Sequence, residues 1–202
     1  HSIKGILCST GGLTANAVLP FLDYESIKKN PKVFCGFSDI TTLLLALLKK
    51  CEIIVFHGPT LLPSFGDFEG PIGFTEEGFL GAVSGCNPIG IIPSAIECVA
   101  ENLYWERDDN RALKMKTVDP AFCCGSNKDA EGVVIGGNLQ TLSMLLHTEY
   151  FPDIDRSILF LEEESLSTAW YERYLIALEQ DGIFNKVVGI VLARPSNSFR
   201  EE

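Results

Sequence analysis

Residues 33–41 read Val-Phe-Cys-Gly-Phe-Ser-Asp-Ile-Thr, a short apolar run followed by a Gly-x-Ser turn and the start of a helical pattern. A serine at such a strand-to-helix turn lies at the carboxyl edge of a sheet, with the first N–H groups of the helix beside its Oγ. The spacing predicts a nucleophile turn at Ser38, with Ile40 where Gly-x-Ser-x-Gly has its second glycine. The alternative is that Ser38 or Asp39 only caps the helix.

The same alternation of apolar runs and helical patterns continues along the chain. The runs are continuous rather than alternating, which is typical of parallel strands buried on both faces. Strands are predicted at 3–8, 33–36, 53–56, 133–135, 158–161 and 187–192, and helices at 13–22, 26–30, 40–50, 75–84, 138–148 and 168–180. This order predicts an α/β fold, with a mostly parallel sheet in an N-terminal unit and a second, smaller α/β unit after it.

Composition changes suggest three parts. Residues 1–86 are predicted to form an N-terminal α/β nucleophile domain, and residues 131–202 a C-terminal domain. Residues 87–130, whose second half is polar and charged, are predicted to be a linker or flap. Because the sequence opens within one predicted strand and stops just after another, we expect both domains to be incomplete and the 202 residues to be the middle of a longer protein.

Composition also restricts the partners. Sixteen Lys and Arg residues against 27 Asp and Glu residues give a net charge of −11, which repels nucleic acid and anionic membrane surfaces. No apolar run approaches the roughly 18 residues of a membrane span, and no signal-peptide pattern opens the sequence. The seven cysteines contain no C-x-x-C pair, so we expect reduced thiols, no metal site and a cytoplasmic location.

Two further segments are candidates for chemistry. Gly11 and Gly12 follow the first predicted strand, and such a turn presents N–H donors suited to an oxyanion hole, or is simply a tight turn. Glu162 follows the strand at 158–161 as the first of three acids. A single acid at a strand end can orient a histidine, whereas three in a row are more typical of a solvated strand end.

Asn138 and the histidines allow both structural and functional interpretations. Asn138 precedes a leucine-rich helical pattern and is well explained as its N-cap. His57 follows a predicted strand at its carboxyl end, where parallel sheets bind ligands. His147 falls on the leucine-rich helix and is expected to be partly buried.

Taken together, these segments and their order resemble the serine LD-carboxypeptidase family, which includes the microcin C self-immunity proteins. The matching motifs are Thr10-Gly11-Gly12, Gly36-Phe37-Ser38-Asp39-Ile40-Thr41, Phe56-His57-Gly58-Pro59, Gly136-Gly137-Asn138-Leu139 and Leu159-Phe160-Leu161-Glu162. The resemblance implies a serine peptidase with a Ser-His-Glu triad on a two-domain fold. Such an enzyme hydrolyses an amide at the C-terminal end of a small peptide-like substrate, without metal or cofactor.

The resemblance also assigns roles to residues. Ser38 resembles the nucleophile and Glu162 the triad acid, and the backbone N–H groups of Asp39 and Gly12 resemble the oxyanion hole. Substrate-binding positions are expected at Gly11, His57, Asn138, Trp105 and Arg107. Trp105 and Arg107 look more like the microcin-immunity branch, where they would stack on and pair with a nucleotide-like group. The alternative is a surface aromatic residue beside a solvated run of charges.

The triad histidine of the family comes from a C-terminal stretch that these 202 residues do not contain. Loss of one triad member typically costs on the order of 10⁴ to 10⁶ in rate, so the stretch by itself is expected to be inactive. The resemblance favours a hydrolase acting on a peptidyl- or aminoacyl-nucleotide substrate, and a homodimer. The alternatives are a murein tetrapeptide LD-carboxypeptidase of cell-wall recycling, an inactive fragment or peptide-binding module, and a thiol enzyme built on Cys35 or Cys8.

Overall fold

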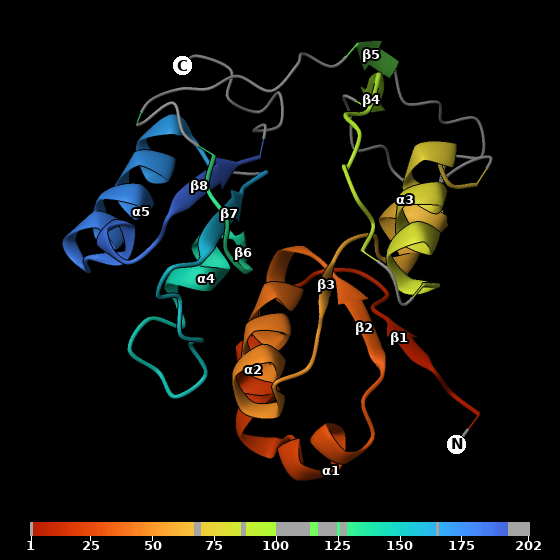
Figure 1. Ribbon diagram of the computed structural model, residues 1–202, viewed down its shortest axis with the longest axis horizontal. Helices are drawn as coiled ribbons and strands as arrows, with labels where there is room; N and C mark the ends of the chain where they lie inside the picture. The colour runs from red at the N-terminus through yellow and green to blue at the C-terminus, as the bar shows by residue number, and fades with distance from the viewer. Residues whose placement is uncertain are drawn as a thin grey trace. The chain divides into compact units, whose positions relative to one another are not determined.

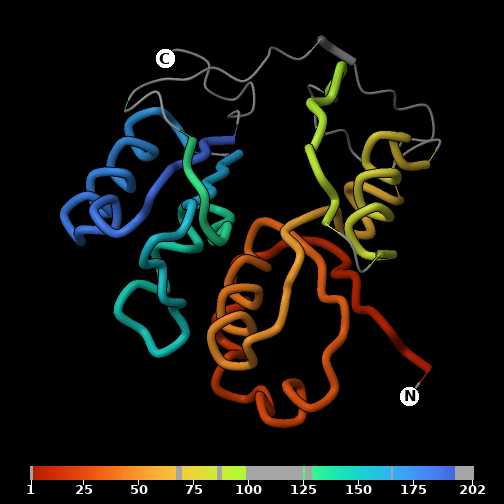
Figure 2. The backbone as a smooth tube through the Cα atoms, in the orientation of Figure 1, coloured from red at the N-terminus to blue at the C-terminus, as the bar shows by residue number. Residues whose placement is uncertain are grey.

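The computed structural model describes residues 2–66, 70–85, 88–99, 114–116, 125, 129–164 and 166–193 (Figure 1). Contacts group the chain into unit 1, made of residues 1–60 and 129–202, and unit 2, made of residues 61–128. The backbone therefore leaves unit 1 after residue 60 and returns to it at residue 129 (Figure 2). The division at residues 86 and 130 made from the sequence stays a prediction.

The N-terminal segment of unit 1 forms a three-stranded parallel sheet in the order β1-β2-β3. Gly5 pairs with Val33, and Gly36 pairs with His57. The elements are β1 (Gly5–Leu7), the 3₁₀ helix η1 (Ala15–Phe21), α1 (Tyr24–Lys29), β2 (Val33–Gly36), the 3₁₀ helix η2 (Ser38–Ile40), α2 (Thr41–Cys51) and β3 (Phe56–His57). Most of α2 is buried, as its continuous apolar pattern predicts.

The C-terminal segment of unit 1 forms a second three-stranded parallel sheet, in the order β6-β7-β8. Its elements are β6 (Val134–Asn138), α4 (Leu139–Ser143), β7 (Ile158–Glu162), α5 (Thr168–Gln180), the 3₁₀ helix η4 (Ile183–Asn185) and β8 (Gly189–Leu192). Asn138 of β6 pairs with Glu162 of the central strand β7, so the last residues of these two strands lie side by side. The two parallel sheets with their helices confirm the predicted α/β class.

One hydrophobic core joins the two segments of unit 1. Leu19, Leu45 and Ala46 from the N-terminal segment belong to the same buried cluster as Leu139 and Leu159 from the C-terminal segment. Burying a leucine fully stabilises the folded state by about 1.5–3 kcal/mol. The two segments therefore fold as one body, although unit 2 separates them in the sequence.

Unit 2 contains both helices and strands. These are the π-helical turn η3 (Leu61–Phe65), α3 (Gly73–Val83) and the antiparallel strands β4 (Glu97–Val99) and β5 (Lys114–Lys116). The predicted linker or flap at 87–130 thus includes a strand pair. No helix in the described part of the chain is both long enough and apolar enough to cross a membrane.

Several predicted elements need correction. The apolar run at 53–56 is not a strand along its length: only Phe56 and His57 pair with β2, and Ile54 is 78% exposed. The helix predicted at 13–22 is a 3₁₀ helix containing Pro20, and the helix predicted at 138–148 keeps α geometry only to Ser143. His147 lies beyond α4, and its imidazole is 79% exposed rather than partly buried.

Candidate functional site

The Ser38 turn has the backbone geometry of a strained strand-to-helix turn. β2 ends at Gly36, Phe37 is extended, and Ser38, the first residue of η2, has a φ of 61°. A left-handed conformation costs a residue other than glycine roughly 1–2 kcal/mol. Such strain is typical of a nucleophile held out at the carboxyl end of a strand.

Helix capping does not account for this turn. The N-cap positions of η2 and α2, Phe37 and Ile40, make no side-chain capping hydrogen bond. The Asp39 side chain points elsewhere, because its Oδ2 accepts a hydrogen bond of 2.9 Å from the backbone N–H of Ala15. The capping interpretation of Ser38 and Asp39 is therefore not supported.

The glycine turn that follows β1 packs directly against Ser38. A Cβ atom built on Gly11 would lie 2.9 Å from both Cβ and Oγ of Ser38, and one built on Gly12 would lie 3.1 Å from Oδ2 of Asp39. A side chain at Gly11 would force Ser38 to move, and one at Gly12 would displace the Asp39 carboxylate slightly. The structure thus brings the two segments that sequence analysis singled out separately to one place.

Two of the three acids at the carboxyl end of β7, Glu162 to Glu164, are shielded from solvent. The Glu162 side chain is 17% exposed, and its Oε1 lies 3.5 Å from Nε2 of His57. Glu163 is 4% exposed, and Glu164 is exposed. The alternative prediction, that the three acids form a fully solvated strand end, is therefore wrong. Nε2 of His57 faces Glu162. The substrate contact predicted for His57 stays a prediction.

Asn138 links the two segments of unit 1. Its Oδ1 accepts hydrogen bonds from N and Oγ1 of Thr141. Asn138 therefore caps α4, as predicted. Its Nδ2 donates to Oε2 of Glu163 at 3.3 Å, and its backbone N–H donates to Oγ1 of Thr41 at 3.0 Å. Sequence reasoning did not single out Glu163 or Thr41, because nothing local distinguishes a buried acid in a run of three or a threonine in an apolar helix.

Burial disfavours the thiolate form of the two cysteines near the Ser38 turn, Cys8 and Cys35. Burial, with a smaller contribution from the Cys8 thiol, raises the pKa of Cys35 to about 11. Burial also raises the pKa of Cys8. A thiol enzyme needs a lowered pKa, so these environments disfavour the thiol alternative.

Other candidate features lie outside this cluster. Trp105 and Arg107 fall outside the described residues. Within the described ranges, no three His, Cys, Asp or Glu side chains gather in a way that would hold a metal ion.

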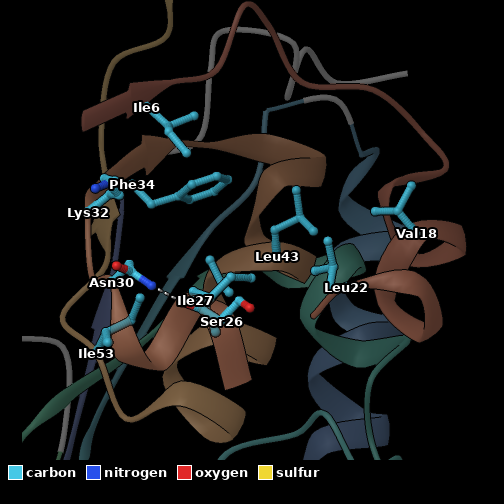
Figure 3. Close-up of a pocket in the computed structure, with 11 residues that line it drawn as sticks. Ile6, Val18, Leu22, Ser26, Ile27, Asn30, Lys32, Phe34, Leu43 and Ile53 are labelled. Atoms are coloured by element: carbon cyan, nitrogen blue, oxygen red, sulfur yellow. Dashed lines mark hydrogen bonds between the residues drawn. The ribbon is translucent and has the colours of Figure 1, made fainter. Parts of the chain in front are cut away.

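Unit 1 also contains an apolar pocket of about 490 Å³ between its first sheet and the helices η1, α1 and α2 (Figure 3). Ile6, Phe34 and Leu43 are among the residues that line it. Ser38 and Glu162 are not among them. The pocket is therefore distinct from the candidate site.

Comparison with known proteins identifies the family. Residues 1–58 match the LD-carboxypeptidase N-terminal domain, and residues 131–202 match the LD-carboxypeptidase C-terminal domain. The chain belongs to the LD-carboxypeptidase family. This confirms the resemblance stated from the sequence motifs, and the matched ranges contain Ser38 and Glu162.

Relatives within the LD-carboxypeptidase family include the microcin C7 self-immunity protein MccF of Escherichia coli. The two are 37% identical over 197 residues, which cover 95% of this chain and 56% of MccF. The putative carboxypeptidase YocD of Bacillus subtilis is 35% identical to this chain, and the matched residues cover 95% of this chain and 57% of YocD. The chain thus spans a little over half the length of these curated relatives.

Solved structures agree with this assignment. The wild-type apo structure of MccF superposes with a TM-score of 0.88 at 33% identity, covering 98% of this chain and 61% of that one. The muramoyltetrapeptide carboxypeptidase of Oxalobacter formigenes has a TM-score of 0.72 at 26% identity, covering 96% and 57% of the two chains. The LD-carboxypeptidase fold is therefore shared across nearly the whole chain.

Proposed function

We propose that the full-length protein is a serine carboxypeptidase-like hydrolase that cleaves an amide bond in a peptidyl- or aminoacyl-nucleotide substrate. The observation that carries this proposal is the left-handed Ser38 at the end of β2, packed against the Gly11–Gly12 turn. Family membership supports it, because the strain falls on the serine of the family motif. Glu162, at the end of β7, is the proposed triad acid.

The chemistry proceeds through an acyl-enzyme. Oγ of Ser38 attacks the carbonyl carbon while a histidine base, supplied from outside these 202 residues, takes the hydroxyl proton. Glu162 orients that base and stabilises its cation. The backbone N–H groups of Asp39 and Gly12 stabilise the oxyanion. The C–N bond then breaks, the base returns the proton to the leaving nitrogen, and water releases the acyl group from Ser38 by the same steps.

The substrate class is supported by what related proteins bind. MccF has been solved in complex with aspartyl sulfamoyl adenosine and with glutamyl sulfamoyl guanosine, and a tryptophan mutant of MccF with adenosine monophosphate. In this chain we propose that Gly11 and Asn138 contact the acyl part. Trp105 would stack on the base and Arg107 would pair with the linking group.

A murein tetrapeptide is the second candidate substrate. The similarity to the muramoyltetrapeptide carboxypeptidase of Oxalobacter formigenes favours it, at lower identity and TM-score than the similarity to MccF. Both substrates would use the same nucleophile and triad acid. The two candidates therefore differ in substrate recognition rather than in chemistry.

A competition experiment tests both. The full-length protein is incubated with a mixture of aspartyl sulfamoyl adenosine and a murein tetrapeptide, and the products are followed by mass spectrometry with Ser38→Ala as the control. We expect release of aspartate from the nucleotide analogue and no product with Ser38→Ala. Loss of the terminal D-alanine from the tetrapeptide alone would favour the second candidate. Binding without any product would favour a non-catalytic module.

A further inference from the structure

His57 and Glu162 are the last residues of β3 and β7, two strands that belong to different sheets of unit 1. Nε2 of His57 and Oε1 of Glu162 are 3.5 Å apart. Both atoms are buried, and neither makes a hydrogen bond within the described part of the chain. Buried polar atoms are nearly always hydrogen-bonded, and a movement of roughly half an ångström would bring this pair to ordinary hydrogen-bond length.

Packing fixes the orientation of the His57 ring. The ring of Phe160 meets it edge to face, with 5.4 Å between centroids and 66° between planes. On another side the ring approaches Gly137, where an added Cβ atom would lie 3.1 Å from Cδ2 of His57. The imidazole therefore has little freedom to turn its Nε2 away from Glu162.

The backbone that carries His57 is fixed to the strand that presents Ser38. Gly36 pairs with His57 in the sheet, and the N–H of Gly58 donates to the carbonyl of Gly36 at 3.1 Å. Sγ of Cys35 donates to the carbonyl of Pro59 at 3.4 Å. Because burial raises the pKa of Cys35 to about 11, the thiol keeps the proton that this contact requires. A movement of His57 would therefore disturb the end of β2.

We infer that His57 is a positioning residue that holds the Glu162 carboxylate, so that its second oxygen can orient the histidine base. The inference rests on the proposed function, which makes Glu162 the triad acid. A carboxylate accepts hydrogen bonds at both oxygens, so an Oε1 held by His57 leaves Oε2 for the base. In this role His57 acts through the Glu162 carboxylate rather than on the reacting atoms.

The first test compares His57→Ala and His57→Gln in the full-length protein, with aspartyl sulfamoyl adenosine as substrate. His147→Gln is the matched control, because that imidazole is exposed and pairs with Asp181 instead. We expect His57→Ala to lower kcat about 10- to 100-fold, the size of effect seen when a supporting partner is removed, with KM changed less than about 2-fold. The amide N–H of His57→Gln should restore most of kcat. A loss confined to KM, or no loss, would overturn the inference.

The second test is a double-mutant cycle with Glu162→Gln. If His57 works through the carboxylate, His57→Ala should cost nothing further in the Glu162→Gln background. A merely structural contact would instead lower the free energy of unfolding and would still reduce kcat independently of Glu162. Fully additive losses in kcat would overturn the positioning role.

A spectroscopic measurement separates this inference from the proposed function. In the wild-type protein, NMR should detect a slowly exchanging Nε2 proton of His57, assigned by its absence in His57→Gln. Glu162→Gln should abolish this protection, whereas Ser38→Ala should leave it unchanged. Rapid exchange in the wild type would overturn the pairing. A protected proton in a protein without turnover would instead show that the proposed function, and the catalytic role resting on it, is wrong.

Discussion

Unit 1 contains two strand-to-helix turns that solve the same geometric problem differently. At the end of β2, Ser38 takes a φ of 61°, and the helix behind it starts without a side-chain cap. At the end of β6, Asn138 has a φ of −64° and caps α4 through its own Oδ1. The second turn contributes to stability, whereas the first carries strain that its own side chain does not offset. Backbone strain of this kind is found at functional sites, and this agrees with the role proposed for the Ser38 turn.

The two turns are nevertheless coupled. The backbone N–H of Asn138 donates to Oγ1 of Thr41, the first residue of α2. A change in one turn can therefore be tested for its effect on the other. If the contrast is correct, substitutions at the Ser38 turn lower the free energy of unfolding less than substitutions at the Asn138 turn do.

The largest expected effect is that of Ser38→Ala in the full-length protein. Turnover should fall on the order of 10⁴- to 10⁶-fold, because the nucleophile is lost. Ser38→Gly should be equally inactive but about 1 kcal/mol more stable than Ser38→Ala, since glycine adopts a φ of 61° without strain. Turnover assays and urea unfolding measure the two effects. Turnover by Ser38→Ala within tenfold of the wild type would contradict the nucleophile assignment.

A matched pair of glycine substitutions tests the contrast directly. Gly11→Ala places a methyl group 2.9 Å from both Cβ and Oγ of Ser38, so that Ser38 must shift. We expect turnover to fall on the order of 100-fold, with a loss of stability smaller than that of Gly137→Ala. Gly137 has a φ of 142°, which alanine rarely adopts, and Gly137→Ala would place a methyl group 2.6 Å from Oγ1 of Thr41. We expect it to lower the free energy of unfolding by about 3 kcal/mol. The same assay and unfolding curves serve both variants, and equal losses of stability would remove the contrast.

Asn138→Ala should have a smaller effect, lowering the free energy of unfolding by about 1–2 kcal/mol through loss of the helix cap. Asn138→Asp retains the acceptor for Thr141 but loses the Nδ2 donor to Glu163. It therefore separates the contribution of the cap from that of the buried carboxylate. Chemical denaturation of the two variants beside the wild type gives both values. An unchanged midpoint for Asn138→Ala would show that the cap contributes nothing.

Asp39→Ala should give the smallest effect, a loss of about 1 kcal/mol in the free energy of unfolding. Its carboxylate accepts from the N–H of Ala15 and so fixes the chain beyond the Gly11–Gly12 turn. Asp39→Asn keeps an acceptor and should lose less. Thermal unfolding of the pair measures the difference. Identical melting temperatures for all three proteins would exclude a stabilising role for this bond.

The sequence predicted the parts of unit 1 that depend on near neighbours. The helix expected at 40–50 is α2, and the strand expected at 33–36 is β2, because apolar periodicity and the Gly-x-Ser turn are local signals. The strand predicted at 53–56 was wrong because that prediction, too, used only local signals. Its apolar residues suggested a buried strand, but Ile54 faces solvent and only the last residue of the run continues into β3.

Contacts between distant segments could not be predicted in the same way. Thr41 and Asn138 are 97 positions apart in the sequence, and nothing near either residue indicates the hydrogen bond between them. The burial of Glu163 and the approach of His57 to Glu162 likewise follow from the packing of the two segments of unit 1. Motif order predicts that Ser38 and Glu162 belong to one site, whereas the contacts around each of them are visible only in the structure.

The interrupted layout of unit 1 has a consequence for biosynthesis. Residues 1–60 emerge from the ribosome before the core partners that lie beyond residue 128. At about 5–20 residues per second, translation of the intervening stretch takes several seconds, during which the apolar face of α2 lacks its partners from α4 and β6. Non-local pairing of this kind slows folding. The nascent chain therefore exposes this apolar face during that interval, and the hydrogen bond from Asn138 to Thr41, beside the Ser38 turn, can form only after β6 has been synthesised.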